Sequence, residues 1–253
     1  MSLSVVRDRP AQMSAEEWQT RIDLAACARL CAHYGWVEST GNHVSAKVPG
    51  EDAFLVNPYD LMFEEVTASS LLKLDFEGNL AAPTEHQQNP TAFYVHGGFY
   101  IERADIGCAI HVHSVAGTAV SCLAEGIMPI NQTAMTIADH VAYHDYEGIV
   151  LDRSESERIN RHLGNRRFLI LRNHGTMTFG ETIPEAFLRC YVLERTCEVQ
   201  LQVLASGRPI YPVTPEAISS AGEIGGKMGP KSGERGWASQ LRLLDRISPD
   251  YKQ

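Results

Sequence analysis

The run Ile-Gly-Cys-Ala-Ile-His-Val-His at residues 106–113 is short and mostly apolar, which predicts a buried β-strand. Alternate residues of a strand point to the same face of the sheet. The imidazoles of His111 and His113 are therefore expected on one side of the sheet, where they would form half of a metal site. Such a pair also occurs in structural and surface positions, so it does not establish a metal site by itself.

A third histidine follows the next compact apolar run. Residues 168–172 predict a strand, and Asn173, His174 and Gly175 come directly after it. The glycine permits a tight turn that directs His174 back toward the sheet. Three imidazoles with an open position suit Zn²⁺, with Mn²⁺, Fe²⁺, Co²⁺ and Ni²⁺ as alternatives. Taken alone, His174 could equally be a turn residue without a ligand role.

Hairpins and helices surround these two segments. A capping box at Ser14–Glu17 begins a predicted helix over 14–34, and Pro49-Gly50 separates two predicted strands that form a hairpin. Further helices are predicted over 90–102, 154–163 and 184–205. The alternation of strands and helices predicts an α/β protein with a mixed sheet covered by helices.

Charge and composition exclude several classes of partner. The 253 residues carry 22 Lys and Arg against 31 Asp and Glu, a formal net charge of −9. This balance excludes nucleic-acid phosphate as the main partner, and an acidic membrane surface would repel the chain. No stretch approaches the roughly 20 apolar residues that span a bilayer. Residues 1–10 lack an apolar run of signal-peptide length, so we expect a cytoplasmic protein. From the charge balance we expect no nucleic-acid or membrane partner.

The last forty residues differ in composition from the rest. From Thr214 to Gly236 the chain is rich in glycine and charge, which predicts a poorly ordered segment before a last helix over 237–247. The sequence therefore predicts one domain over residues 1–213 and a C-terminal tail over 214–253.

Four motifs in a fixed order resemble the class II aldolase/adducin superfamily. They are Thr-Gly-Asn-His-Val-Ser at 40–45, Phe-Leu-Val-Asn-Pro-Tyr at 54–59, Ala-Ile-His-Val-His-Ser at 109–114 and Arg-Asn-His-Gly at 172–175. The resemblance implies a three-layer αβα fold with a central, mostly antiparallel sheet. It also implies that His111, His113 and His174 hold a catalytic divalent metal. Enzymes of the superfamily are often cyclic tetramers with the metal near a subunit boundary, so a homotetramer is expected.

The chain departs from the sugar-phosphate enzymes that it resembles. Those enzymes hold phosphate with a Thr, an Asn, a Gly and a Ser-Ser pair, and they use a Glu as acid and base. Here Thr40 matches, whereas His43, Asp60, Pro90-Thr91 and Ala92 stand at the other positions. A carboxylate would repel a phosphate dianion, and proline has no N–H to donate. These departures from the family pattern predict a non-phosphorylated substrate.

Other polar residues near these motifs are candidates for the remaining roles. The returning proton could come from water or from His43, His96 or Tyr146, with a core or interface position as the alternative for His96. The candidate substrate-binding residues are Thr40, Asn42, Asp60 and Thr91. His140 and His144 could form the far wall of the pocket or a subunit contact.

A retained metal site without the usual Glu favours chemistry that needs little help from protein side chains. Decarboxylation of a hydroxyaryl or oxo carboxylate fits, because CO₂ leaves without a proton donor and a Lewis acid stabilises the developing enolate. The sequence therefore favours a metal-dependent carbon–carbon lyase that acts on a small carboxylate. Three alternatives stay open: retro-aldol cleavage of a non-phosphorylated substrate, a non-catalytic adducin-like interaction module, and an iron-dependent oxygenase.

Overall fold

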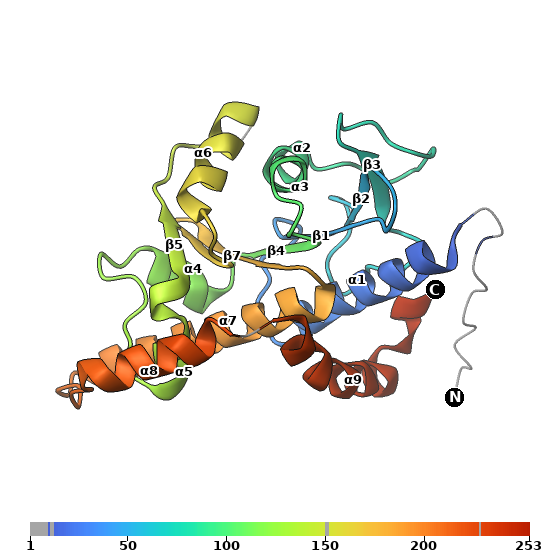
Figure 1. Ribbon diagram of the computed structural model, residues 1–253. Helices are drawn as coiled ribbons and strands as arrows, with labels where there is room; N and C mark the ends of the chain where they lie inside the picture. Colours follow the sequence, from blue (N-terminus) through green and yellow to red (C-terminus); the bar gives the residue numbers. More distant parts are fainter. Residues whose placement is uncertain (1–9, 11–12, 150–151, 228) are drawn as a thin grey trace.

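The computed structural model describes residues 10, 13–149, 152–227 and 229–253 (Figure 1). The prediction for the N-terminal residues 1–10 therefore lies almost wholly outside the described residues. No helix in the described ranges is long and apolar enough to cross a membrane.

The described residues form one seven-stranded sheet with the order β3-β2-β1-β4-β7-β6-β5. Its strands are β1 (His43–Lys47), β2 (Ala53–Val56), β3 (Leu72–Asp75), β4 (Cys108–Val112), β5 (Val141–His144), β6 (Phe168–Leu171) and β7 (Gly175–Gly180). Every neighbouring pair is antiparallel except β5 and β6, which are parallel. The expected mostly antiparallel sheet is confirmed.

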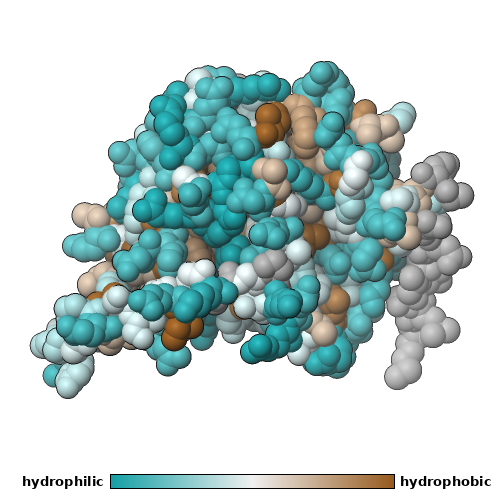
Figure 2. Space-filling model, viewed as in Figure 1, coloured by the Kyte–Doolittle hydropathy of each residue, from teal (hydrophilic) through white to brown (hydrophobic). Residues whose placement is uncertain are grey.

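Helices cover both faces of the sheet and complete three layers (Figure 1). One face carries α2 (Pro90–Ala92), the π-helical turn η1 (Phe93–Gly97), α3 (Gly98–Glu102) and α6 (Arg153–Leu163). The other face carries α1 (Ala15–His33), α4 (Val115–Ser121), α5 (Gln132–Ile137), α7 (Ile183–Ala205) and α9 (Pro230–Ile247). The 3₁₀ turn η2 (Ala138–His140), α8 (Pro215–Gly225) and the 3₁₀ turn η3 (Pro249–Lys252) complete the described elements. Figure 2 shows a mostly hydrophilic outer surface on the side where α7, α8 and α9 lie, as expected for helices that bury one face.

The central strand β7 was not predicted from the sequence. Its six residues, Gly-Thr-Met-Thr-Phe-Gly, begin and end in glycine and resemble a turn more than a strand. The structure requires the small residues for close packing, because a Cβ on Gly175 would lie 2.7 Å from the Val112 carbonyl oxygen and one on Gly180 would lie 2.5 Å from the Ala186 nitrogen. Glycine therefore marks the close approach of another backbone, that of β4 at Gly175 and that of α7 at Gly180.

The segment after residue 213 is more ordered than the sequence predicted. It forms α8 and α9, and the helix expected at 237–247 begins at Pro230. Trp237 is buried in the core and its indole nitrogen donates to Asp23 Oδ1 at 3.0 Å, while Arg29 pairs with Asp250 at 2.8 Å. These contacts with α1 explain why the segment is ordered. The sequence prediction failed because the high glycine content obscured an amphipathic helix. The domain boundary at residue 213 stays a prediction.

Candidate metal and substrate site

The three predicted metal ligands come together at one end of the central strands. His111 lies at the end of β4, His113 follows it, and His174 lies in the turn that joins β6 to β7, where the backbone of Asn173 adopts a φ of 57°. Asparagine tolerates this left-handed conformation better than most residues. One nitrogen from each imidazole lies within 4.8 Å of the others.

Hydrogen bonds at Nδ1 fix the orientation of two of these rings. His111 Nδ1 lies 2.9 Å from the Thr176 carbonyl oxygen, so this nitrogen donates. His113 Nδ1 lies 3.1 Å from Glu38 Oε2 and donates to that carboxylate. Both Nε2 atoms therefore carry lone pairs, yet they face each other at 2.8 Å. Two facing lone pairs repel each other unless a cation lies between them. In metal sites, a histidine that binds the ion through Nε2 typically donates its Nδ1 proton to a carboxylate or a backbone carbonyl, as these two do.

The protonation of the three histidines also suits a metal. Burial, followed by the charges of neighbouring histidines, lowers the pKa of His111 well below its usual value. Burial lowers the pKa of His113, and burial together with His113 lowers that of His174 to about 4. All three imidazoles are therefore neutral at pH 7, as metal ligation requires. The residues present fit the divalent ion that the resemblance implies.

A pocket of about 360 Å³ opens beside these histidines. Its lining residues are Glu38, Gly41, His43, Tyr59, Asn89, Thr91, Val95, His111, His113, Tyr146, Gly148, Ile149, Leu171, Asn173 and His174. Among these described residues there is no Lys or Arg, and Glu38 is the one carboxylate. This lining offers no cationic side chain to a phosphate.

A buried chain of hydrogen bonds leads from the pocket into the core. His43 Nδ1 lies 2.7 Å from His96 Nε2, and His96 Nδ1 lies 2.5 Å from Ser45 Oγ. Ser45 Oγ in turn lies 2.6 Å from the hydroxyl oxygen of Tyr100. Burial lowers the pKa of His96 to about 3, and burial with the neighbouring histidines lowers that of His43 well below its usual value. Both rings are neutral at pH 7, and only His43 of the two lines the pocket.

The other predicted site residues lie at different distances from the pocket. Tyr146 and Thr91 line it, whereas the half-buried Thr40 does not. Asn42 lies behind it: its Oδ1 accepts from the His113 amide at 3.0 Å and its Nδ2 donates to the Glu38 carbonyl oxygen at 3.0 Å. Asn42 therefore ties the segment before β1 to the end of β4.

Three further polar residues lie outside the pocket. Asp60 is exposed and is bonded to the His86 ring at 3.0 Å and the Gln87 amide at 2.7 Å. His140 Nε2 donates to the Gly222 carbonyl oxygen at 2.8 Å, so this ring holds α8. His144 is buried on the far side of β5 beside His162 and does not line the pocket.

Glu38 was not identified from the sequence. It stands two residues before Thr40 in the first motif, and its role depends on contact with His113, 75 residues further along the chain. No local pattern predicts that contact. The Glu38–Asn42–His113 arrangement becomes visible only when β1 pairs with β4.

Glu194 on α7 supports the same strands from behind. It is fully buried and accepts hydrogen bonds from the Thr176 hydroxyl at 2.6 Å and from the Ser114 hydroxyl. Burial raises its pKa from 4.5 to about 7, and the two hydroxyl donors offset only part of this rise.

The raised pKa of Glu194 predicts a pH-dependent stability. Between pH 5 and pH 8 the folded state binds more protons at Glu194 than the unfolded state does, so this residue's contribution to the free energy of unfolding falls as pH rises. We expect Glu194→Gln to remove that dependence, so that the variant gains roughly 2 kcal/mol relative to the parent from pH 5 to pH 8. Thermal melts of both proteins across this range measure the effect. A difference that stays constant with pH would contradict it.

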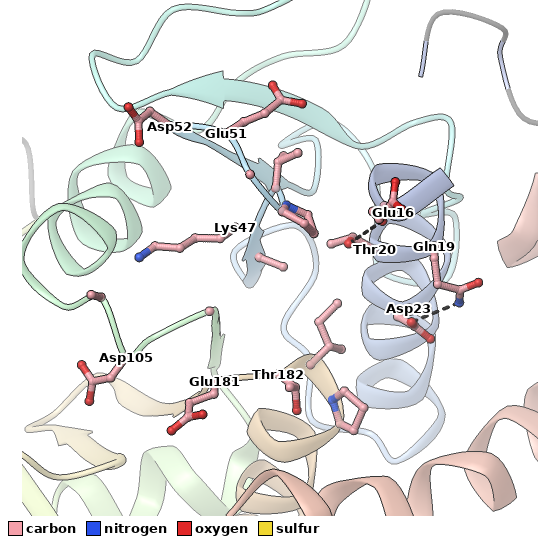
Figure 3. Close-up of a pocket in the computed structure, with 18 of the residues that line it drawn as sticks. Glu16, Gln19, Thr20, Asp23, Lys47, Glu51, Asp52, Asp105, Glu181 and Thr182 are labelled. Atoms are coloured by element: carbon pink, nitrogen blue, oxygen red, sulfur yellow. Dashed lines mark hydrogen bonds between the residues drawn. The ribbon is translucent and has the colours of Figure 1, made fainter. Parts of the chain in front are cut away.

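A second, larger cavity of about 1290 Å³ lies at the opposite end of β1 and β4 (Figure 3). Lys47 enters it from β1, and its acidic lining residues are Glu16, Asp23, Glu51, Asp52, Asp105 and Glu181. Because β1 begins at His43 and ends at Lys47, the length of the strand separates this cavity from the histidines. Its carboxylates disfavour an anionic ligand.

The fold and the histidine site together define the class of protein. Residues 22–201 match the family described as Class II Aldolase and Adducin N-terminal domain. The chain belongs to the class II aldolase/adducin family.

Relatives of this chain include both candidate enzymes and adducins. A protein of Pseudomonas aeruginosa described as a candidate class 2 aldolase is 41% identical over 99% of this chain and 98% of its own length. Mouse alpha-adducin is 40% identical over 74% of this chain, which corresponds to 26% of the adducin. The crystal structure of an aldolase II superfamily protein from Pseudomonas syringae is 36% identical, covers 96% of this chain and 98% of its own, and superposes with a TM-score of 0.90. An L-fuculose 1-phosphate aldolase from Glaciozyma antarctica covers all of both chains with a TM-score of 0.83 at 23% identity, which shows a shared fold.

Proposed function

We propose that this chain is a cytoplasmic, divalent-metal-dependent carbon–carbon lyase that decarboxylates a non-phosphorylated hydroxyaryl or oxo carboxylate. One observation carries the proposal: three neutral imidazoles converge on a pocket whose described lining has no Lys or Arg. Zn²⁺, Mn²⁺, Fe²⁺, Co²⁺ and Ni²⁺ are all compatible with the ligand set of His111, His113 and His174. Ala92 is fully buried at the position of the family's acid and base, so a different proton donor is required.

A metal held by the three histidines would supply Lewis acidity to the substrate oxygens as the carbon–carbon bond breaks, which lowers the barrier by several kcal/mol. The residues around the metal would orient the ligating imidazoles and return a proton to the substrate. Glu38 and the Thr176 carbonyl keep the ligating nitrogens of His113 and His111 unprotonated. Asn42 acts through His113, and Thr91 and Tyr146 lie where a substrate would contact them.

We assign the returning proton to His43. If Tyr100 donates to Ser45, Ser45 to His96 Nδ1, and His96 Nε2 to His43 Nδ1, then the remaining proton of His43 lies on its Nε2. In this order the Tyr100, Ser45 and His96 protons each have an acceptor within the chain, and the His43 Nε2 proton is left to donate to the substrate. His96 is then a positioning residue, because it acts on the substrate through His43.

Thr40 and Asp60 do not line the pocket, so neither belongs to the proposed set of residues that contact the substrate. Asp60 is held by His86 and Gln87 close to Tyr59, which lines the pocket. The Asp60 carboxylate disfavours a phosphorylated substrate. It is compatible with an uncharged substrate or with one that chelates the metal.

A screen for CO₂ release tests the proposal directly. Hydroxyaryl and oxo carboxylates are incubated with the Zn²⁺, Mn²⁺ and Co²⁺ forms of the protein, and release of CO₂ with a proton at the vacated carbon is expected. Aldehyde release without CO₂ would replace decarboxylation with retro-aldol cleavage. Absence of stoichiometric metal would favour an interaction module, and iron with oxygen uptake would favour an oxygenase.

We also propose that the pocket is completed by a neighbouring copy in a homotetramer. Three apolar side chains that line it are exposed: Tyr59 by 43%, Tyr146 by 55% and Ile149 by 72%. Exposed apolar residues around one opening favour a protein contact there. We expect Ile149→Asp to convert the tetramer to smaller species, measured by light scattering after size exclusion. A parent protein that is monomeric at all concentrations would contradict this assignment.

A further inference from the structure

We propose that His144, Glu147 and Glu155 form a second divalent-metal site, separate from the three-histidine site. One ligand atom from each of the three residues lies within 4.8 Å of the others. His144 ends β5, Glu147 follows it, and Glu155 lies in the first turn of α6. None of the three lines the substrate pocket.

The His144 ring is the first argument for an ion. The residue is only 2% exposed, and its Nε2 has no hydrogen-bond partner among the described residues. Its Nδ1 lies 2.8 Å from His162 Nδ1. When His144 donates this bond, its Nε2 carries a lone pair that points at two carboxylates. A buried nitrogen without a partner is costly, and a cation removes that cost.

The spacing of the three ligand atoms is the second argument. His144 Nε2 lies 3.9 Å from Glu147 Oε1 and 3.8 Å from Glu155 Oε1. Both separations exceed hydrogen-bond length. They approach the separation of two atoms that ligate one ion at about 2.0–2.2 Å each.

The carboxylates are held in a way that leaves one oxygen of each for an ion. Arg158 binds Glu147 through Oε2, at 2.8 Å from Nε and 2.5 Å from Nη2, so Oε1 faces His144. The Glu155 side chain is 12% exposed, and burial and the nearby Glu147 charge raise its pKa. A cation between the carboxylates would relieve their repulsion. One imidazole with two carboxylates suits Zn²⁺ best among common metals.

The site would stabilise one wall of the substrate pocket. Tyr146 lies between His144 and Glu147 in the chain and lines that pocket, as do Gly148 and Ile149. An ion that links Glu147 to Glu155 would fix this segment against α6. Its role is therefore structural support for the segment that carries Tyr146.

Metal stoichiometry tests the second site. Chelator-treated protein is dialysed against Zn²⁺ and its bound metal is measured by mass spectrometry, with Co²⁺ absorption as a second readout. We expect two equivalents for the parent, one for His113→Ala, one for Glu155→Gln and none for the double variant. Glu147→Gln, a change at a partly exposed side chain, is expected to weaken binding at the second site at least tenfold.

Glu157→Gln is the matched control, since Glu157 is exposed on the same helix two residues away and should retain two equivalents. One equivalent in the parent and none in His113→Ala would overturn the second site and leave the proposed function intact. One equivalent in the parent that His113→Ala retains and Glu155→Gln loses would support the second site and overturn the metal-dependent lyase. Two equivalents in both Glu155→Gln and Glu147→Gln would overturn the assignment of these ligands.

Discussion

His113→Ala is expected to remove the metal at the three-histidine site and to lower turnover by about a thousandfold. His113 supplies one of three ligands, and its Nε2 lies 2.8 Å from His111 Nε2. Without it, two imidazoles remain, and Lewis-acid stabilisation of several kcal/mol is lost. Each 1.36 kcal/mol corresponds to a tenfold change in rate. Metal content and CO₂ release by the same preparation measure the two effects together.

The exposed His33 offers a matched control, because His33→Ala removes an imidazole on α1 away from the pocket. We expect that variant to keep parental metal content and turnover. If His113→Ala retained turnover, the lyase proposal would be wrong, whatever the metal content. If it lost turnover and kept its metal, His113 would act on the substrate and the ligand assignment would need revision.

The sequence predicted that His111, His113 and His174 would lie together, because each step depends on local geometry. Alternation along a strand places His111 and His113 on one face, and Gly175 permits the turn that returns His174 to the same place. The antiparallel register of β4 with β7, which pairs Val112 with Thr176, completes the set. The strand and helix patterns alone predicted only a mixed sheet covered by helices. The family resemblance predicted the three-layer fold with a mostly antiparallel sheet.

Other features depend on contacts between distant segments, and the sequence did not predict them. Glu38 supports His113 only after β1 pairs with β4. Thr-rich β7 was missed because its terminal glycines serve close packing instead of turns. His144 was expected at a pocket wall or subunit contact, yet β5 buries it at the α6 side with Glu155. Burial of this kind is a property of the whole fold.

His43→Gln is expected to lower kcat by roughly a hundredfold to ten-thousandfold with metal content unchanged. The side chain lines the pocket and is the only member of the buried hydrogen-bond chain that does so. General acid catalysis contributes about this much when the acid is positioned. Burial holds the pKa of His43 well below its usual value, so the ring is neutral at pH 6 and at pH 8. The neutral ring gives up its Nε2 proton as its Nδ1 takes the His96 proton, the shift continues through Ser45 to Tyr100, and a solvent proton restores the chain. The loss should therefore be similar at both pH values.

Three variants together locate the proton donor. Tyr100→Phe removes the hydroxyl at the far end of the chain, so it should lower kcat less than His43→Gln does and leave KM unchanged. Tyr146→Phe tests the alternative donor, whose ring centroid lies 6.2 Å from that of His174. If Tyr146→Phe abolishes turnover and His43→Gln changes kcat less than threefold, the proton comes from Tyr146. The His43–His96–Ser45–Tyr100 chain would then serve to hold His43 against His111, whose ring centroid is 4.6 Å away, and its loss would appear as weaker metal binding.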